Sequence, residues 1–348
     1  MEGVISKEEE RKQEIVIPPI QVQCIEHRSH SRVCPNCNRV NVANMPAHLK
    51  APIQYGKSVC ATVTYFFAFQ YLPYNRIKKA MNDLFNVSLS EGTIDNMLAK
   101  ATELSMPSYK EIQTRLRESK VVGGDETGTK IGGKKGWFHA WQNSTLTFIV
   151  AAMTRGYQTA EDYFSDGFPM AVYVSDCWSA QLKTIAKLHQ LCLAHLLREL
   201  TNFEDALKCD WSKELKLLFK KAIALKQELQ PHDYLHPPPT INELEQELRK
   251  LLEVDTASFH PKTKAFVKRL IKHRESIFTF LYYPKVPYDN NGSERAIRNV
   301  KVKNKVSGCF RSMQGANRFA VLRSVIDTTL KNTQNVFQAI NLIWKIPT

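Results

Sequence analysis

The sequence predicts a mixed α/β protein in which a sheet is flanked by helices. Four runs rich in β-branched and aromatic residues lie between positions 120 and 176, separated by glycine-containing turns. Before and after this region, apolar residues recur at intervals of three and four, which is typical of helices. At 348 residues the chain is long enough for one large domain with insertions or for several modules around a main core.

The first 50 residues are predicted to form an extended arm. Residues 1–14 are charged and contain no apolar core, so they cannot act as a secretory signal, and we expect the protein to stay in the cytoplasm. Residues 15–44 mix prolines and histidines with the pair Cys34-Pro-Asn-Cys37 and show no sustained helical or strand period.

Residues 51–115 are predicted to be helical. Two sets of apolar residues repeat at helical spacing, Ile77, Met81 and Leu84 followed by Ile94, Met97 and Leu98. Ser88-Leu-Ser90 separates them and indicates a tight turn between two short helices. Such a pair either enters a DNA groove as a helix-turn-helix or simply packs against a core.

The predicted strands occupy residues 121–122, 137–141, 146–152 and 171–174. Gly132-Gly133 indicates a hairpin between the first two, and residues 159–164 a short helical link before the last. Together these segments predict a mixed sheet with helices packed on it.

Helices are predicted for the rest of the chain. Residues 202–283 are helical by periodicity and are interrupted by Pro237-Pro238-Pro239, which indicates an all-helical insertion with a stiff break between helices. A further helix begins near Asn290, and amphipathic helices are predicted over 316–330 and 335–344.

The composition favours a polyanionic partner. Lys and Arg number 48 against 34 acidic residues, a net charge of +14. Nucleic acid is the first such partner to consider, with a solvated basic surface or a membrane-facing patch as alternatives. The longest apolar stretch, residues 59–72, is too short to cross about 30 Å of hydrocarbon, so we expect a buried helix and no membrane association. Eight cysteines without a secretory signal indicate reduced thiols or a metal site.

Asp125 is the first of three candidate catalytic carboxylates. It follows the apolar pair Val121-Val122 through Gly123-Gly124, which predicts a position at or just past the carboxyl end of a strand. Active sites of open α/β sheets gather at that edge. The alternative is a turn residue, because Asp125-Glu-Thr-Gly128 has good type I turn chemistry.

Asp176 and Glu294 are the other two candidates. Asp176 ends the run 171–176 and precedes an apparent helix near Trp178, so it either faces Asp125 across the sheet edge or caps that helix. Glu294 lies three residues after Asn291, so it could simply close a capping box. Capping does not explain why residues 286–325 carry eight Lys or Arg against two acids.

The three carboxylates together have the chemistry of a divalent metal site. Carboxylate oxygens are ligands for Mg²⁺ or Mn²⁺, which take their remaining ligands from water and a substrate phosphate. Two such ions about 3.5–4 Å apart can activate an attacking oxygen and stabilise the leaving one. We therefore expect two Mg²⁺ or Mn²⁺ ions beside a phosphate-binding surface.

The motifs resemble those of the DDE transposases of the insertion sequence 66 family, whose catalytic core is ribonuclease-H-like. Three segments resemble its catalytic motifs in order: Asp125-Glu-Thr-Gly, Ser175-Asp-Cys-Trp and Asp289-Asn-Asn-Gly-Ser-Glu-Arg. Val300-Lys-Val-Lys, Ser307-Gly-Cys-Phe-Arg-Ser312 and the segment from His189 to His195-Leu-Leu-Arg-Glu also resemble the family. The resemblance runs from about residue 25 to the C-terminus.

The resemblance implies the roles of these residues. Asp125, Asp176 and Glu294 would be the metal ligands, and the reaction would be hydrolysis and strand transfer of phosphodiester bonds at transposon ends. Residues 116–201 and 286–348 would form the ribonuclease-H-like core, interrupted by the helical insertion of 202–285. Residues 1–50 would be an arm with part of a zinc-finger-like element, and residues 51–115 a helix-turn-helix-like DNA-binding region.

The N-terminal cysteines depart from the family pattern. Family members usually carry an earlier Cys-x-x-Cys pair, and here Cys34 and Cys37 stand alone. Two thiolates do not complete a tetrahedral Zn²⁺ site, although Cys24, His27 or His30 could add ligands. A truncated, catalytically inactive DNA-binding protein is therefore the alternative function.

Two further groups of residues are candidates for the site. Cys192 and His195 share a helix face and form either a metal-linked pair beside the carboxylates or a buried pair in the core. The candidates for phosphate contact are Arg295, Arg298, Lys301, Lys303, Lys305 and Arg311. A solvated helix face is the alternative for this basic group.

The main hypothesis is a nucleoid-associated transposase that acts on double-stranded DNA, at transposon ends and target, as a homo-oligomer. Intact carboxylates favour this hypothesis over a non-catalytic DNA-binding remnant. If the chain were an α/β protein with no nucleic-acid role, the three motifs and the basic stretch would all be coincidences.

Overall fold

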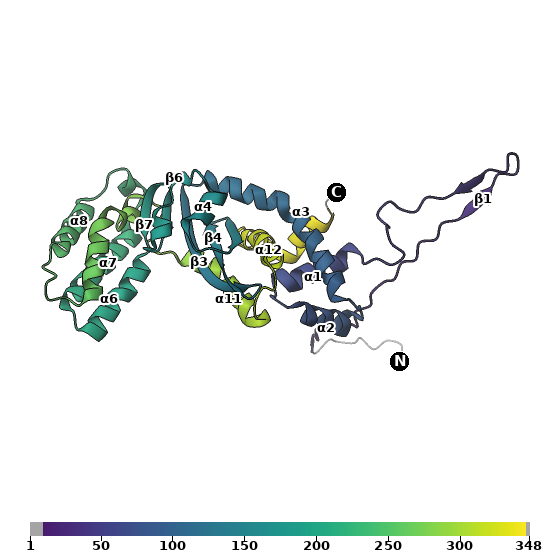
Figure 1. Cartoon of the computed structure of the whole chain (residues 1–348), viewed down its shortest axis with the longest axis horizontal. Coiled ribbons are helices and arrows are strands. Elements are labelled where there is room, and N and C mark those ends of the chain that lie inside the picture. The colour runs from purple at the N-terminus through teal and green to yellow at the C-terminus, as the bar shows by residue number, and fades with distance from the viewer. Residues whose placement is uncertain (1–9, 346–348) are drawn as a thin grey trace, which may run out of the picture.

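A five-stranded mixed sheet lies in the middle of the molecule (Figure 1). The computed structural model describes residues 10–345, so the first nine residues of the predicted arm and the last three of the chain lie outside the described residues. The strands, in sheet order, are β5 (Thr147–Ala152), β4 (Lys134–Gln142), β3 (Val121–Ile131), β6 (Phe168–Ser175) and β7 (Ala186–Leu191). The pairs β3–β4 and β4–β5 are antiparallel, whereas β3–β6 and β6–β7 are parallel. The predicted mixed α/β fold is confirmed.

Strand β3 is longer than the sequence predicts. It continues through Asp125 to Ile131 and returns as β4 after Gly132-Gly133, whose φ angles of 57° and 77° suit a tight hairpin turn. The hairpin prediction is confirmed. The interpretations of Asp125 as a strand-end or turn residue were wrong, because pairing with β4 carries the strand past it. Strand β7 was not predicted, because its sequence lacks an apolar alternation and parallel pairing with β6 supports it instead.

Gly123 and Gly124 stand within β3 because both faces of the strand are tightly packed there. A Cβ on Gly123 would lie 2.7 Å from the Ser293 Oγ, and a Cβ on Gly124 would overlap the fully buried Tyr173 hydroxyl. These glycines therefore allow close approach of neighbouring groups, whereas the sequence alone suggested that they mark a turn.

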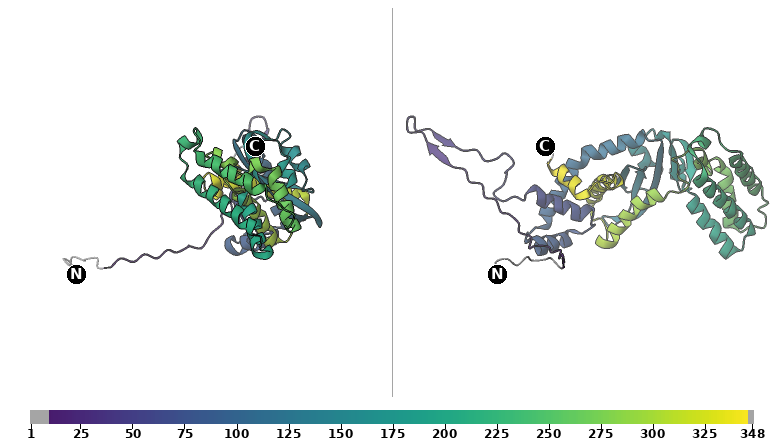
Figure 2. Two further views of the ribbon diagram at one scale, coloured as in Figure 1. Left: turned by 90° about the vertical axis from the view of Figure 1, so that its left-hand side faces the viewer. Right: turned by 180° about the vertical axis from the view of Figure 1, so that it is seen from behind.

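Helices cover both faces of the sheet (Figure 2). On one face lie α11 (Asn291–Ser307) and α12 (Met313–Lys331), and on the other α3 (Glu91–Arg117) and α4 (Tyr157–Tyr163). Helix α12 also covers the outer edge of β5, where the Ile149 backbone N–H donates to Ser324 Oγ at 2.8 Å. This contact satisfies a donor that an open edge strand would leave unpaired.

The region before the sheet is helical, as predicted. It contains α1 (Lys57–Ala68), α2 (Tyr74–Phe85) and the 27-residue α3. Ser90 caps the start of α3, because its hydroxyl accepts a hydrogen bond from the Thr93 N–H at 3.0 Å. Most of the predicted apolar positions, including Ile77 and Ile94, are buried in a cluster shared with the sheet, α11, α12 and α13. The DNA-binding role of this region stays a prediction.

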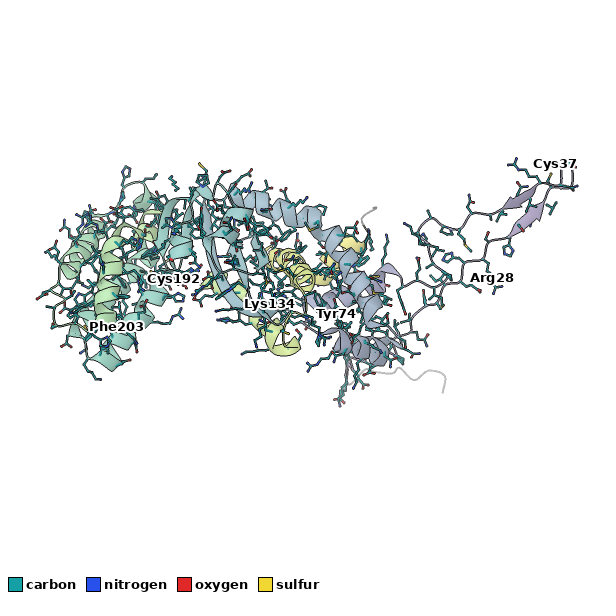
Figure 3. All side chains as sticks on the ribbon, viewed as in Figure 1. Arg28, Cys37, Tyr74, Lys134, Cys192 and Phe203 are labelled. Atoms are coloured by element: carbon teal, nitrogen blue, oxygen red, sulfur yellow. The ribbon has the colours of Figure 1, made fainter. Side chains whose placement is uncertain are left out.

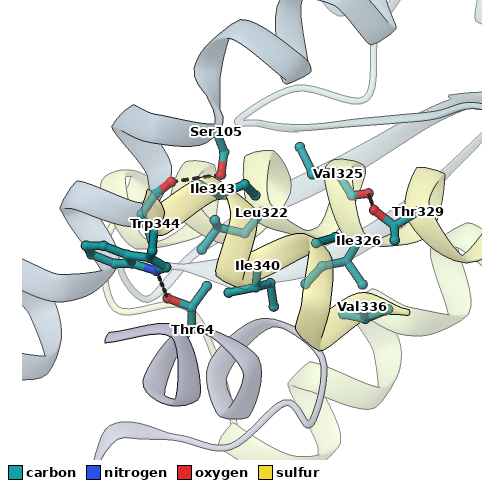
Figure 4. Close-up of a pocket in the computed structure, with 12 residues that line it drawn as sticks. Thr64, Ser105, Leu322, Val325, Ile326, Thr329, Val336, Ile340, Ile343 and Trp344 are labelled. Carbon is teal, nitrogen blue, oxygen red and sulfur yellow. Dashed lines mark hydrogen bonds between the residues drawn. The ribbon is translucent and has the colours of Figure 1, made fainter. Parts of the chain in front are cut away.

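The C-terminal helix α13 (Val336–Lys345) closes this cluster against α1, α3 and α12 (Figure 4). The small apolar pocket between these helices is lined by few polar groups, and each has a partner. Trp344 Nε1 donates to Thr64 Oγ1 at 3.3 Å, and Ser105 Oγ donates to the Ala101 carbonyl at 2.8 Å. We therefore regard the pocket as core packing.

A helical unit projects from the opposite end of the sheet (Figure 1). Its elements are α6 (Leu193–Leu207), α7 (Asp210–Glu228), α8 (Pro239–Leu252), α9 (Pro261–Lys272) and α10 (Thr279–Tyr282). A second hydrophobic cluster fills this unit and continues onto β6 through Val172 and Val174. Pro238 and Pro239 stand at the start of α8, where proline is tolerated, so the predicted break between helices is confirmed.

The N-terminal arm extends away from the body (Figure 3). It carries a short hairpin of β1 (Ser31–Val33) and β2 (Val40–Val42), with Cys34 and Cys37 at its turn. Within residues 10–345, no helix is long and apolar enough to span a membrane.

Candidate active site

The sheet register brings Asp125 and Asp176 together. Val121 to Gly123 pair with Val172 to Val174, an offset of 51 residues that also separates the two aspartates. Since alternate residues of a strand point to the same face, Asp125 shares a face with Gly123, and Asp176, directly after β6, continues the face of Val174. The two carboxylates therefore lie on one face, just beyond the parallel pairing of β3 with β6.

Asp125 is largely buried. Burial, with the nearby charge of Asp176 as the second cause, raises its pKa from 3.8 to about 7. The Glu126 N–H donates to Asp125 Oδ1 at 2.8 Å and opposes this shift, while Glu294 adds to it. Burial and the neighbouring carboxylates therefore both favour the protonated form of Asp125.

Asp176 does not cap the following helix. The short helix α5 (Ser179–Leu182) begins after Trp178 without a side-chain cap. Asp176 Oδ1 is buried and, within the described residues, has no aligned hydrogen-bond donor, although the His195 Nδ1 lies 2.9 Å away at ion-pair distance. The capping alternative was wrong, because Asp176 contacts His195 instead of a backbone N–H of the helix.

Glu294 reaches the same place from the first turn of α11. Asn290 precedes the helix, and its Nδ2 donates to the Gly124 carbonyl at 2.7 Å, which ties the start of α11 to β3. No side-chain cap forms there, so the capping-box alternative was also wrong. The Glu294 Oε1 instead lies 3.1 Å from an Arg198 Nη and 3.7 Å from His195 Nε2.

His195 links two of the carboxylates. It lies in the first turn of α6, and its Nδ1 is 2.9 Å from Asp176 Oδ1 and 3.3 Å from the Cys192 sulfur. Contact with Asp176, followed by contact with Cys192, raises the pKa of His195 to about 10. The Cys192 side chain is buried where the sheet meets the helical unit (Figure 3).

The sequence alone did not assign these two residues to the site. Their three-residue spacing suggested a shared helix face but favoured a buried pair in the core. Arg198, one turn further along α6, was not predicted as a site residue, although it lies in the segment ending His195-Leu-Leu-Arg-Glu that resembles the family.

Asp125, Asp176 and Glu294 offer carboxylate oxygens, the ligand type that hard divalent cations prefer. The Asp176 Oδ1 is buried and has the His195 Nδ1 as its neighbour at 2.9 Å. Asp176, Cys192 and His195 have ligand atoms within 4.8 Å of one another, which adds a nitrogen and a sulfur next to the carboxylates.

The basic residues predicted for phosphate contact separate into two groups. Arg295, Arg298, Lys301 and Lys305 are exposed at spacings of three and four on α11, and Arg311 is exposed beyond it. Lys303 does not belong with them. Its ammonium is buried, donates to the Tyr71 and Leu72 carbonyls at 3.1 Å each, and has a pKa lowered to about 7 by burial. The prediction of phosphate contact by Lys303 was wrong.

The opposite face of the sheet holds a second acid beside Asp125. The Glu126 side chain is 5% exposed, and Arg155 Nε donates to its Oε1 at 2.8 Å. Gln181 Nε2 donates to its other oxygen. The Arg155 guanidinium lies 5.0 Å from the Trp137 ring and 3.9 Å from the Trp178 ring. Glu126 is therefore a paired acid, which the sequence did not distinguish from Asp125.

The cysteine pair of the arm lacks further ligands. Backbone hydrogen bonds from Asn36 and Cys37 lower the pKa of the Cys34 thiol. Among the described residues no third histidine, cysteine or acid joins the two cysteines in a metal-sized cluster. Zn²⁺ binding by Cys34 and Cys37 stays a prediction without a complete ligand set.

Clustered carboxylates beside an exposed basic helix are the features of a protein that acts on nucleic acid. The chain belongs to the transposase IS66 family, whose model matches residues 52–318. It is also similar to the uncharacterized protein y4hP of Sinorhizobium fredii (strain NBRC 101917 / NGR234), with 22% identity over 353 residues. That alignment covers 90% of this chain and 63% of the relative, so the chain spans less than two thirds of the relative's length.

Proposed function

We propose that this chain is a DDE transposase that cleaves DNA and joins strands at the ends of an insertion sequence. The observation that carries the proposal is the convergence of Asp125, Asp176 and Glu294 from β3, β6 and α11. Membership of the transposase IS66 family supports the activity and makes DNA the expected partner.

The carboxylates are proposed to hold two Mg²⁺ or Mn²⁺ ions, in keeping with the general use of divalent ions by transposases. When bound, the ions supply Lewis-acid stabilisation and an activated water or 3′-hydroxyl for in-line displacement at phosphorus. The protein's contribution is to gather three negative charges on one sheet face. Burial first and the charge of Asp176 second raise the pKa of Asp125, so a bound cation would favour its ionised form.

His195 and Arg198 are proposed to position the carboxylates. The His195 Nδ1 lies 2.9 Å from Asp176, and its Nε2 lies 3.1 Å from Arg198 and 3.7 Å from Glu294. Arg198 reaches Glu294 from the same helix and presents a cation near the position of the scissile phosphate. The exposed basic face of α11 then neutralises phosphates of the duplex beyond the cut.

The proposed catalytic core comprises residues 116–201 and 286–348 and is ribonuclease-H-like. Three consecutive antiparallel strands followed by two parallel strands are compatible with this assignment. The helical unit of 202–285 interrupts the core between the second and third carboxylates. Assembly as a homo-oligomer on paired DNA ends is part of the proposal.

The test is cleavage of a labelled duplex that carries the terminal repeats flanking the gene, with Mg²⁺ or Mn²⁺. The native chain is compared with Asp176→Asn and with the matched control Asp166→Asn, which changes an exposed acid after α4. Metal-dependent nicking by the native chain and the control, but not by Asp176→Asn, supports the proposal. Salt-sensitive binding without cleavage would support the inactive DNA-binding protein instead.

A further inference from the structure

The exposed basic surface continues beyond α11 onto the tip of the β3–β4 hairpin. Phe310, in the segment after α11, forms a bridge with Ile131, and its N–H donates to the Lys130 carbonyl at 3.1 Å. The Gly132 N–H donates to the Phe310 carbonyl at 2.8 Å. These bonds hold the backbone of Arg311, whose side chain is exposed, next to the hairpin turn.

The hairpin tip carries three exposed lysines that lie outside the family-like motifs and outside the predicted phosphate-contact residues. They are Lys130, Lys134 and Lys135, and neither residues 127–142 nor residues 295–326 contain an acidic residue. Lys134 lies opposite Ile131 in the β3–β4 register, on the strand face that also carries Asp125 and packs against α11. Lys130 and Lys135 lie opposite each other on the face of Glu126, where the Lys135 Nζ is 5.2 Å from the Trp137 ring.

The hairpin and α11 run side by side from the carboxylates. Asn290 contacts β3 at Gly124, and further along Thr129 Oγ1 donates to Asn304 Oδ1 at 3.0 Å. From Glu294 to Lys305 the helix advances about 16 Å at 1.5 Å per residue. This length corresponds to about five base pairs at 3.4 Å each.

We propose that Lys134, together with Arg311, binds the phosphates of double-stranded DNA about five or more base pairs from the scissile bond. The inference rests on the proposed function, because the number of base pairs is counted from a scissile bond held at the carboxylates. The hairpin tip thereby sets the direction of the duplex, which follows α11 away from the helical unit.

The first test measures the salt dependence of binding to a 30-base-pair duplex, by fluorescence anisotropy in EDTA. Lys134→Gln and Arg311→Gln are combined in one chain, the hairpin variant. The matched control changes two exposed lysines of α9, Lys262 and Lys268, to Gln. The hairpin variant is expected to lower the slope of log affinity against log salt by about 1.8, at 0.9 per lost phosphate contact.

The outcomes separate the two proposals. An unchanged slope in the hairpin variant, or an equal loss in the α9 control, would overturn the inference and leave the catalytic proposal intact. A hairpin-dependent slope in a chain that never cleaves DNA would support the inference and count against the catalytic proposal. Failure of the native chain to bind duplex would overturn both.

A second measurement uses Cys309, which is exposed beside Phe310. Its alkylation by iodoacetamide, followed by mass spectrometry, is expected to slow several-fold when the duplex is bound. Cys209, half-buried between α6 and α7, serves as the internal reference and should keep its rate. Equal rates at Cys309 with and without duplex would place the DNA elsewhere.

Discussion

The neighbours Asp125 and Glu126 face opposite sides of β3 and are treated differently by the protein. Glu126 is paired with Arg155 and accepts a hydrogen bond from Gln181. Asp125 faces Asp176 and Glu294 and has a pKa raised to about 7. The comparison teaches that Glu126, whose charge Arg155 neutralises, is structural, whereas Asp125, which has no ion-pair partner among the described residues, is available to an external ligand.

The largest expected difference between the two acids is in catalysis. Asp125→Asn should lower metal-dependent DNA cleavage on the order of 10³-fold, because it removes a ligand of the ions that stabilise the transition state. Glu126→Gln, which keeps the shape and one acceptor oxygen for Arg155, should lower it by less than about tenfold. Single-turnover cleavage rates measure both. Equal losses of cleavage rate in the two variants would show that the acids on the two faces of β3 do not differ in catalysis.

For stability we expect the opposite order: removing the cation of Glu126 should cost more than neutralising Asp125. Arg155→Met leaves the Glu126 carboxylate buried without its cation, and we expect the free energy of unfolding to fall by about 1–3 kcal/mol. Asp125→Asn relieves charge repulsion and should not destabilise the metal-free chain. Urea unfolding in EDTA checks both, and a larger loss in Asp125→Asn than in Arg155→Met would contradict the comparison.

The raised pKa of Asp125 predicts a pH dependence. Between about pH 4 and pH 7 the folded chain holds a proton that the unfolded chain has released, so the free energy of unfolding of the metal-free chain should fall as the pH rises. Above about pH 7 this contribution should level off. The stabilising contribution of His195 is present below pH 6.5 and is lost as the pH rises through its pKa of about 10, largely outside that window.

Urea unfolding in EDTA across this range, with Asp125→Asn as the control, isolates the effect of the aspartate. The variant should lack the fall between about pH 4 and pH 7. A native chain with the same profile as the variant would show that Asp125 titrates at its ordinary pKa.

The smallest expected effect separates exposed from buried basic residues on α11. Lys301→Met should reduce the salt slope of duplex binding by about 0.9, since one phosphate contact is lost. Lys303→Met should leave the slope unchanged, because its ammonium already bonds two backbone carbonyls. Anisotropy titrations at several salt concentrations measure both slopes, and a slope change in Lys303→Met would mean that this lysine reaches the DNA.

Much of the secondary structure could be predicted from the sequence. The hairpin at Gly132-Gly133, the strand before Asp176 and the helices after Asn290 were predicted because turn chemistry and apolar periodicity are local. Strand β7 escaped prediction because its stability comes from pairing with β6 rather than from its own pattern. Gly123 and Gly124 were misleading because close packing across a strand and a chain turn both favour glycine.

The sequence by itself determined which residues could form the site: three carboxylates, their order and a basic stretch after the third. Only the tertiary structure decided that the 51-residue spacing equals the register between β3 and β6, so that two aspartates share a face. It also decided that His195 bridges Asp176 and Glu294, and that Lys303 points into the core. The physical reason is that composition and spacing are properties of the linear sequence, whereas the pairing of charges depends on which distant segments pack together.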